Sequence, residues 1–292
     1  MHPSLLHNGE IRRTSDLLIS PGQTGFMNGW GVFSTLRVYD GVLFAFARHY
    51  NRMKHDALLM HVPFTLTTEE LQRLLLKLVD ANNAVNATLR VSVVRNRGGL
   101  FEGSGIRSDA DLVAFTADLA KWGDGVRLYY VSNARHGASP FAGTKVTSWS
   151  HNLTWYEEAH QRGFDEVILL NEHGEVSECT SANIFALFGN EIVTPPLSTS
   201  GCLPGVTRAL LLEEITIPGL AIRERSISPK ELETADQVFI TSTTRNLLPG
   251  LEIEGRSLRQ SPRQLGILQR AFKEYEAAYA THHSAPRETV KT

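Results

Sequence analysis

Hydrophobic residues recur at helical spacing in the first third of the chain. The clearest segment is "TTEELQRLLLKLV", residues 67–79, where a Thr67–Glu70 capping-box pattern precedes apolar residues at a helical repeat. "FARHYNRMKHDALLM", residues 46–60, has similar helical character. Residues 89–93 instead alternate between apolar and polar, as a half-buried strand does. The pattern predicts an N-terminal region of short strands and two helices.

Beyond residue 125 the apolar positions come in short strand-like runs with few long helices between them. These runs cover residues 126–131, 167–170, 184–187, 192–194 and 238–241. Such an order favours a mixed or antiparallel sheet over a doubly wound parallel one. Two segments that open with Ser-Pro, at 228–233 and 261–279, predict helices because Ser suits the N-cap and Pro the first helical position.

One stretch of this second region breaks its own apolar pattern. "DEVILLNEHGEVSECTSANIFAL", residues 165–187, is typical of two strands joined by a turn. A carboxylate and small polar residues interrupt the second strand, namely Glu178, Cys179, Thr180, Ser181 and Asn183. A core strand has no need of such residues, so the interruption requires another explanation.

The segment "ADLAKWGDG", residues 117–125, combines small, charged and glycine residues between two strand-like runs, as linkers do. We therefore expect an α+β fold of two domains. A small α/β N-terminal domain would cover residues 1–116, and a larger C-terminal domain with a mixed sheet or barrel would cover residues 126–280. Residues 281–292 are polar and predict a frayed tail.

Composition narrows the range of partners. With 29 Lys and Arg against 31 Asp and Glu, the net charge of -2 gives no bulk attraction to nucleic acid or to a membrane surface. No apolar run approaches the roughly 18 residues of a membrane span. The two cysteines, Cys179 and Cys202, and an N-terminus without a signal-like segment predict a cytoplasmic protein with a small or mixed-charge ligand.

Lys145 stands apart from the other lysines. It lies in "SPFAGTKVTSWSHNLTW", and no other Lys, Arg, Asp or Glu occurs between Arg135 and Glu157. Without nearby carboxylates, burial would lower the pKa of its amine toward neutrality and make it a usable nucleophile or Schiff-base former. A lysine in a surface loop is the alternative.

Two segments have the features of an anion site. "LPGVTRALLLEE" places Gly205, Val206 and Thr207 at the start of a predicted helix, where backbone N–H groups and the helix dipole attract phosphate. "VFITSTTRNLLPG" runs from a strand into a hydroxyl-rich turn at residues 241–244. An ordinary helix cap and an ordinary loop are the alternatives. Neither segment is a nucleotide-binding loop, so we expect a single phosphate.

His49, Arg52 and Asp56 share one face of the predicted helix at 46–60, because they are three and four residues apart. Arg52 would suit a bidentate phosphate contact, and a surface ion pair with Asp56 is the alternative. No His or Cys set has metal-ligand spacing, and no G-x-S-x-G occurs, so the sequence supports neither a metal site nor a serine hydrolase.

The chain resembles the fold-type IV (class IV) pyridoxal-phosphate enzymes over about residues 7–280. The resemblance is carried by "GWGVFSTLRVYDGVLFAFARHYNRM", by Lys145 followed by "RGFDEVILLNEHGEVSECTSANIF", by "LPGVTR" and by "DQVFITSTT". This group includes branched-chain and D-amino-acid aminotransferases and aminodeoxychorismate lyases. It implies pyridoxal 5'-phosphate as cofactor and a homodimer, with active sites at the domain boundary and a loop lent by the neighbouring subunit.

The resemblance also implies roles for single residues. Lys145 matches the lysine that forms the internal aldimine and moves the proton at the substrate Cα. Glu178 matches the carboxylate that keeps the pyridine nitrogen protonated, so that the ring accepts the electron pair of the broken Cα–H bond. The other cofactor-binding matches are Arg52, Val206, Thr207, Ser242 and Thr243 at the phosphate, Ser181 and Leu203 at the ring, and Asn183 as a supporting polar group. Trp149 and Ser150 stand where many relatives carry a tyrosine, whose role is therefore not transferred.

The implied reaction moves an amino group between an amino acid of branched-chain type, or an amine, and a 2-oxo acid. The substrate-binding candidates are Arg37, Thr35, Arg97 and Thr244. Branched-chain aminotransferases usually have F-E-G-x-R where this chain has Phe33 to Arg37 as F-S-T-L-R, and Thr35 instead matches the F-x-T-x-R of the lyases. Release of pyruvate from aminodeoxychorismate to give 4-aminobenzoate is therefore the alternative, although residues 100–102 lack the Arg-Gly-Tyr of the lyases.

Overall fold

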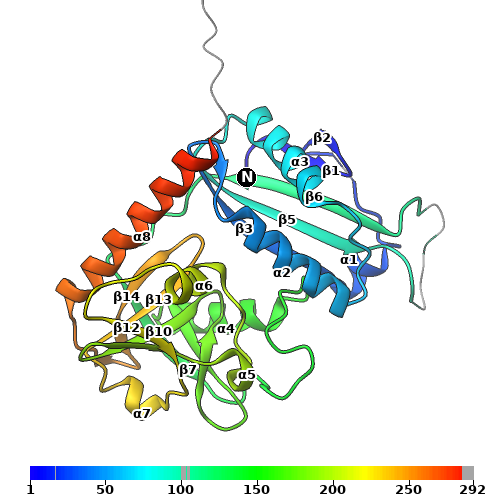
Figure 1. The fold of residues 1–292 in the computed structure, drawn as a ribbon. Coiled ribbons are helices and arrows are strands. Elements are labelled where there is room, and N and C mark those ends of the chain that lie inside the picture. The colour runs from blue at the N-terminus through cyan, green and yellow to red at the C-terminus, as the bar shows by residue number, and fades with distance from the viewer. Residues whose placement is uncertain (17, 100–102, 104–105, 285–292) are drawn as a thin grey trace, which may run out of the picture. The chain divides into compact units, whose positions relative to one another are not determined.

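The computed structural model describes residues 1–16, 18–99, 103 and 106–284 of the chain (Figure 1). The chain divides into two compact units. Unit 1 comprises Met1–Leu119, Lys145–Ser148 and Lys273–Thr292, and unit 2 comprises Ala120–Thr144 and Trp149–Phe272. The first change of unit falls inside the predicted linker at 117–125. Residues 145–148 and the end of the chain lie in unit 1, which the predicted ranges did not foresee.

Unit 1 is built on a six-stranded antiparallel sheet with the order β2-β1-β6-β5-β3-β4. Its strands are β1 (Ser4–His7), β2 (Glu10–Arg13), β3 (Gly31–Tyr39), β4 (Val42–Leu43), β5 (Ala87–Arg95) and β6 (Ala110–Ala117). Val32 pairs with Val93 and Leu36 with Leu89, so these apolar residues share one face. The alternation that predicted a strand at 89–93 is confirmed.

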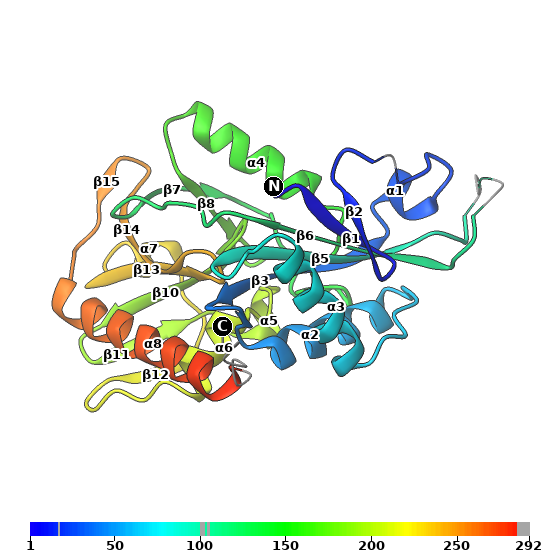
Figure 2. The same ribbon diagram turned by 90° about the horizontal axis from the view of Figure 1, so that it is seen from above.

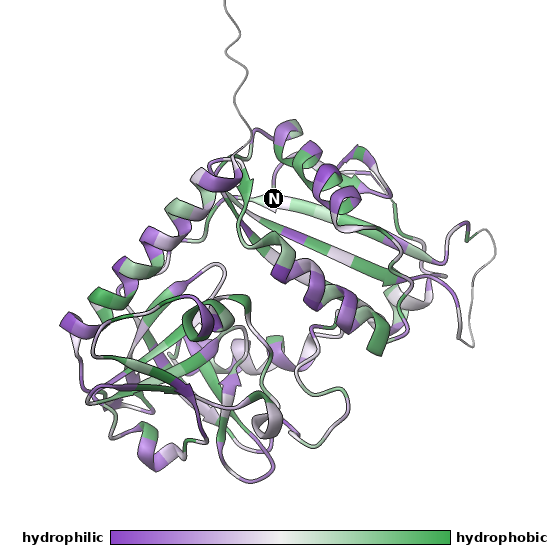
Figure 3. Ribbon diagram, in the orientation of Figure 1, coloured by the Kyte–Doolittle hydropathy of each residue, from purple (hydrophilic) through white to green (hydrophobic). Residues whose placement is uncertain are grey.

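Two helices, α2 (Phe46–Leu59) and α3 (Thr68–Ala81), lie along one face of this sheet (Figures 1 and 2). Their buried residues join those of the strands in one core, and each helix carries both hydrophobic and hydrophilic residues (Figure 3). The Thr67–Glu70 capping box of α3 is present, which confirms that prediction. A third, short helix, α1 (Thr24–Asn28), ends at Gly29.

Unit 2 contains a nine-stranded sheet with the order β12-β11-β10-β13-β14-β7-β8-β9, in which β15 pairs with β14. Its strands are β7 (Val126–Val131), β8 (Glu166–Leu170), β9 (Val176–Cys179), β10 (Asn183–Phe188), β11 (Glu191–Thr194), β12 (Ala221–Glu224), β13 (Gln237–Ser242), β14 (Asn246–Ile253) and β15 (Arg256–Ser257). β7 runs parallel to β8 and β14, and β11 runs parallel to β12, whereas the other pairs are antiparallel. The predicted mixed sheet is confirmed.

The helices of unit 2 are short apart from two. They are α4 (Ser150–Gln161), α5 (Leu197–Ser200), α6 (Val206–Glu213), α7 (Pro229–Leu232) and α8 (Pro262–His283), the last of which continues into unit 1. Both Ser-Pro helix starts are confirmed, since α7 and α8 begin at those prolines. α8 ends at His283, so residues 281–283 of the predicted tail are helical.

The stretch at 165–187 forms three strands, not two. β8 pairs with β9, which places Leu169 opposite Glu178, whereas β10 pairs with β13. Between β9 and β10 the chain turns, and the Cys179 N–H donates to the Ala182 carbonyl at 2.7 Å. The prediction of one interrupted strand is wrong, because Thr180 and Ser181 lie in a turn between β9 and β10 that moves the chain from one partner strand to another.

Within the ranges that the structure describes, no helix has both the length and the apolar character of a membrane span.

Candidate active site

In unit 1, Lys145 lies in an extended segment, Lys145–Ser148, that runs beside β3. The Phe33 N–H donates to the Lys145 carbonyl at 3.1 Å, and the Thr147 N–H donates to the Gly31 carbonyl at 2.9 Å. Backbone hydrogen bonds on both sides of residue 146 therefore fix the position of the lysine backbone.

A glycine permits this close pairing. Gly29 has a φ of 61°, and a Cβ built on it would lie 2.9 Å from the Cα of Ser148. The Thr147 hydroxyl donates to the Gly29 carbonyl at 2.7 Å. Only glycine tolerates both the left-handed backbone and this contact.

Lys145 has a carboxylate at its backbone and an aromatic ring at its amine. Its N–H donates to Asp56 Oδ2 at 3.2 Å, and Asp56, on α2, is 2% exposed. Burial raises the pKa of Asp56, whereas the hydrogen bond from Lys145 and the charge of Arg52 lower it. The Lys145 Nζ lies 4.5 Å from the centroid of the Phe33 ring. Asp56 thus anchors Lys145, and the expected alternative of a surface ion pair with Arg52 is wrong.

Arg52 is held by a buried serine and histidine. Its guanidinium donates to Ser34 Oγ at 2.9 Å, and Ser34 Oγ lies 2.8 Å from Nδ1 of His49. Burial lowers the pKa of His49 well below its ordinary value, and the positive charges of Arg52 and Lys145 lower it further. The imidazole is therefore neutral. Burial lowers the pKa of Arg52 to about 10, which leaves the guanidinium charged at neutral pH.

In unit 2, Glu178 on β9 has two partners. Arg135 Nε donates to its Oε1 at 2.7 Å, and the Leu203 N–H donates to its Oε2 at 2.9 Å. Arg135 also donates to Asn152 Oδ1, on α4, at 3.3 Å. A carboxylate that is 7% exposed is thus held by one cation and one backbone donor. No sequence pattern pointed to Arg135, because no spacing rule links it to a residue 43 positions away.

The start of α6 carries the next group of predicted residues. Asn183 donates to the Leu203 carbonyl at 2.9 Å, and a Cβ at Gly205 would lie 2.0 Å from Asn183 Oδ1. Gly205 is the N-cap residue, and no side chain caps the helix there. The first N–H groups of α6, at Val206 and Thr207, have no acceptor within the helix. The segment therefore has the donors of an anion site.

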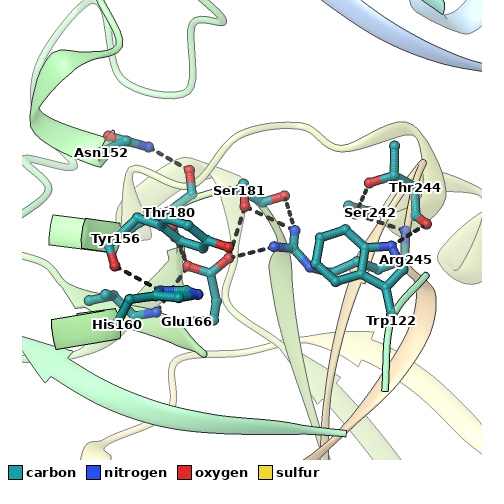
Figure 4. Close-up of polar contacts among 11 residues, drawn as sticks. Trp122, Asn152, Tyr156, His160, Glu166, Thr180, Ser181, Ser242, Thr244 and Arg245 are labelled. Carbon is teal, nitrogen blue, oxygen red and sulfur yellow. Dashed lines mark hydrogen bonds and ion pairs between the residues drawn. The ribbon is translucent and has the colours of Figure 1, made fainter. Parts of the chain in front are cut away.

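The hydroxyl-rich turn joins β13 to β14, where Ser242 pairs with Asn246. The Arg245 N–H donates to the Ser242 carbonyl at 3.2 Å, and the Arg245 side chain runs to Ser181 and Glu166 (Figure 4). The Ser181 hydroxyl donates to Glu166 Oε2 at 2.8 Å. Ser181 therefore belongs to a polar network that also holds the turn.

Three of the four predicted substrate residues belong to unit 1. Thr35 and Arg37 share a face of β3 with Phe33, and Arg37 donates to Asn86 Oδ1 at 3.4 Å. Arg97 lies beyond β5, with its Nε 3.5 Å from Asp109 Oδ1. Thr244 lies in unit 2. Residues 100–102, which separate this chain from the lyases, lie outside the described residues.

Arg90 was not predicted, although it contacts the same aromatic ring as the lysine. It pairs with Thr35 across β5 and β3, and its Cζ lies 3.7 Å from the centroid of the Phe33 ring that Lys145 also contacts. Burial lowers the pKa of Arg90, and the described part of the chain offers this guanidinium no hydrogen bond or ion pair. The alternation that predicted β5 placed Arg90 on its polar face, which was the available signal.

Comparison with known proteins gives a consistent result. The family model "Amino-transferase class IV" matches residues 31–253, most of the chain. The chain belongs to the class IV aminotransferases. A Methanocaldococcus jannaschii protein described as "Putative branched-chain-amino-acid aminotransferase" is 30% identical over 91% of this chain and 93% of its own. The D-alanine aminotransferase of Bacillus licheniformis is 28% identical over 87% of this chain and 89% of its own. A branched-chain aminotransferase of Thermoproteus uzoniensis, solved with norvaline, has a TM-score of 0.86 at 25% identity and covers 96% of both chains.

Membership of the class IV aminotransferases confirms the predicted family, fold class and pyridoxal-phosphate-dependent aminotransferase chemistry. The residues present fit that cofactor. Arg52 in unit 1 and the uncapped start of α6 in unit 2 are each of a kind that binds phosphate, and the held carboxylate of Glu178 is of the kind that pairs with a ring nitrogen. The roles of the individual residues stay predictions.

Proposed function

We propose that the protein transfers an amino group between an amino acid with an apolar, branched-chain-like side chain and a 2-oxo acid. One observation carries the proposal. The Lys145 amine and the Arg90 guanidinium both lie on the Phe33 ring, at 4.5 and 3.7 Å from its centroid. An apolar side chain packs well on an aromatic face, and a carboxylate pairs well with a guanidinium. The relatives named for branched-chain substrates support the same choice.

In this proposal each predicted residue serves one cofactor molecule. When bound, pyridoxal 5'-phosphate supplies the aldehyde carbon that takes up the amino group and a ring that withdraws electrons. Lys145 provides the amine that attaches the cofactor and moves the proton at the substrate Cα. Glu178, oriented by Arg135 and the Leu203 N–H, holds the proton on the ring nitrogen.

The phosphate would be bound by a cation, by backbone donors and by hydroxyl groups. These come from Arg52, Val206, Thr207, Ser242 and Thr243. Ser34 and His49 would keep Arg52 in place, since both are buried and one of them accepts its hydrogen bond.

The test is a half-reaction followed by a complete turnover. Purified protein given L-leucine alone is expected to change from the aldehyde to the amine spectrum of the cofactor, and then to form glutamate when 2-oxoglutarate is added. Lys145→Ala is expected to abolish both changes. Lys77→Ala, at an exposed position of α3, is the matched control and should behave as the wild type.

The alternative function is the lyase reaction. Thr35, which matches the lyase pattern, lies on the same face of β3 as Phe33 and opposite Arg90, where it would meet the same substrate. Release of pyruvate from aminodeoxychorismate, with no spectral change on any amino donor, would establish the lyase and exclude the transaminase.

We also propose that the protein is a cytoplasmic homodimer. Its two cysteines, Cys179 and Cys202, are buried and form no disulfide, which suits a reducing compartment. Large apolar side chains are exposed on unit 2, including Phe141 at 52% and Leu153 at 60%, which suits a surface that a second subunit covers.

A further inference from the structure

Unit 2 contains a buried ion pair that the proposed cofactor contacts do not use. Arg245 Nη2 lies 3.1 Å from Glu166 Oε2, and the two side chains are 4% and 0% exposed. Glu166 is the first residue of β8, and Arg245 lies in the turn before β14. Burying two charges costs free energy unless further hydrogen bonds satisfy both groups. The residues that supply those hydrogen bonds therefore show which parts of the fold the ion pair connects.

Arg245 joins two segments that are both predicted to contact the cofactor. Its Nη1 donates to Ser181 Oγ at 2.9 Å and to the Ser181 carbonyl at 3.3 Å. Its backbone N–H donates to the carbonyl and the hydroxyl of Ser242, each at 3.2 Å. Figure 4 shows the side chain reaching from the Ser242–Thr244 turn to Ser181 and Glu166. One guanidinium therefore fixes how far the turn lies from Ser181.

Glu166 and Thr180 belong to the same hydrogen-bond network as Arg245 and Ser181. Glu166 Oε1 accepts hydrogen bonds from the N–H of Thr180, at 3.2 Å, and from its hydroxyl. The Thr180 carbonyl accepts from Asn152, which Arg135 holds. The turn that carries Ser181 is therefore fixed by partners on β8 and α4, and it offers Arg245 a rigid attachment.

Trp122 holds the turn from another direction. The Arg245 Cζ lies 4.1 Å from the indole ring, and the indole Nε1–H donates to the Thr244 carbonyl at 2.8 Å. Trp122 belongs to the segment predicted as a linker. Stacking on a planar guanidinium leaves its N–H groups free to bond in the plane, so Trp122 and Ser181 bind Arg245 together.

We propose that Arg245, supported by Trp122, is a positioning residue that holds the Ser242–Thr244 turn where Thr243 meets the phosphate of the cofactor. This inference rests on the proposed function, in which Thr243 donates hydrogen bonds to the phosphate of the cofactor. Arg245 acts through the turn and not by touching the cofactor. Its removal therefore weakens the contribution of the phosphate to binding more than it weakens the contribution of the ring.

The test compares binding of pyridoxal 5'-phosphate with binding of pyridoxal, which lacks the phosphate, to the apoprotein. Arg245→Lys keeps a charge for Glu166 but loses the planar fork that reaches Ser181. Trp122→Phe keeps an aromatic ring but loses the bond to the Thr244 carbonyl. Absorbance titration measures both affinities for each variant, and thermal unfolding measures stability.

Arg245→Lys is expected to lower the affinity for pyridoxal 5'-phosphate by about tenfold or more, the range in which outer partners of binding groups act at metal sites. Trp122→Phe should lower it by a smaller factor. Neither should change the affinity for pyridoxal by more than about twofold, because Ser181, the predicted ring neighbour, keeps its separate hydrogen bond to Glu166. Leu258→Ala, in the core of the same unit, is the control that lowers stability without changing the ratio of the two affinities.

Equal losses for the two ligands, or no loss in either variant, would overturn the proposal and leave Arg245 a purely structural residue. If Arg245→Lys does not fold, Trp122→Phe decides, because it removes no buried charge. Failure of the proposed function is visible separately, as wild-type protein in which borohydride reduction does not attach the cofactor to Lys145.

Discussion

At the scale of single residues, the surroundings of Ser34 change the interpretation of the F-S-T-L-R motif at residues 33–37. Branched-chain aminotransferases usually carry glutamate at this position, and its loss counted against that assignment. Ser34 is fully buried and contacts Arg52 and His49, whereas Thr35 lies on the other face of β3. The missing glutamate therefore bears on the predicted phosphate arginine and not on the substrate face.

Asp56 gives a residue-scale prediction about pH. Burial raises its pKa above the ordinary value of 3.8. A carboxyl whose pKa is higher in the folded protein contributes stability that is complete below the ordinary pKa and is lost as pH rises through the raised value. Asp56→Asn removes this loss and keeps an acceptor for the Lys145 N–H. The melting temperature of the variant should exceed that of the wild type at pH 7, and the difference should shrink toward pH 4.

Thermal unfolding of the apoprotein between pH 4 and pH 8 checks this prediction. A variant that melts below the wild type at pH 7 would contradict it, and would mean that the charge of Asp56 stabilises Arg52 and Lys145 by more than its burial costs.

Roles were proposed for residues only where a motif carried them. Lys145, Glu178 and Arg52 came from segments with a known order, and the structure places each in a defined setting. Arg135 and Arg245 had no such signal, because their partners lie 43 and 64 residues away and only the paired strands bring them together. The spacing of apolar and polar residues indicates which face of an element a residue occupies, but not which remote residue shares that face.

At the scale of elements, local chemistry predicted several of the helix starts. The Thr67 cap and the two Ser-Pro pairs start helices where expected. The polar residues between β9 and β10 were misjudged, because a tight turn between two strands and a polar patch in one strand have the same composition. Hydrogen bonding decides between them, since β9 and β10 pair with different strands.

The start of α6 supports an element-scale prediction. In Gly205→Ala the new Cβ would lie 2.0 Å from Asn183 Oδ1, so the Asn183 bond to Leu203 must move. We expect a loss of about 1–3 kcal/mol in the free energy of unfolding, typical of overpacking, together with weaker binding of the phosphate. Urea unfolding and cofactor titration measure the two effects.

Gly266→Ala is the matched control, because Gly266 lies inside α8 with nothing within 4 Å of a new Cβ. It should stabilise the protein by about 0.5–1 kcal/mol through helix propensity alone. If Gly205→Ala behaved like Gly266→Ala, the close approach at α6 would have no energetic weight.

At the scale of the whole molecule, the proposed dimer predicts a mass. Sedimentation equilibrium of the wild type should give close to twice 32.4 kDa. The double variant Phe141→Glu and Leu153→Glu places charges at two exposed apolar positions of unit 2 and should shift the mass toward the monomer. A wild-type protein that is monomeric at micromolar concentration would refute the dimer.

The segment Lys145–Ser148 has a consequence for recombination between relatives. Unit 1 is assembled from three separate stretches of the gene product, and the shortest of them carries the lysine. A hybrid that exchanged only residues 1–119 would set a foreign β3 and a foreign Asp56 position against the native lysine segment, whose backbone bonds to both. Crossovers chosen by sequence continuity would therefore separate the lysine from its supports, whereas an exchange that moves residues 145–148 along with 1–119 keeps them together.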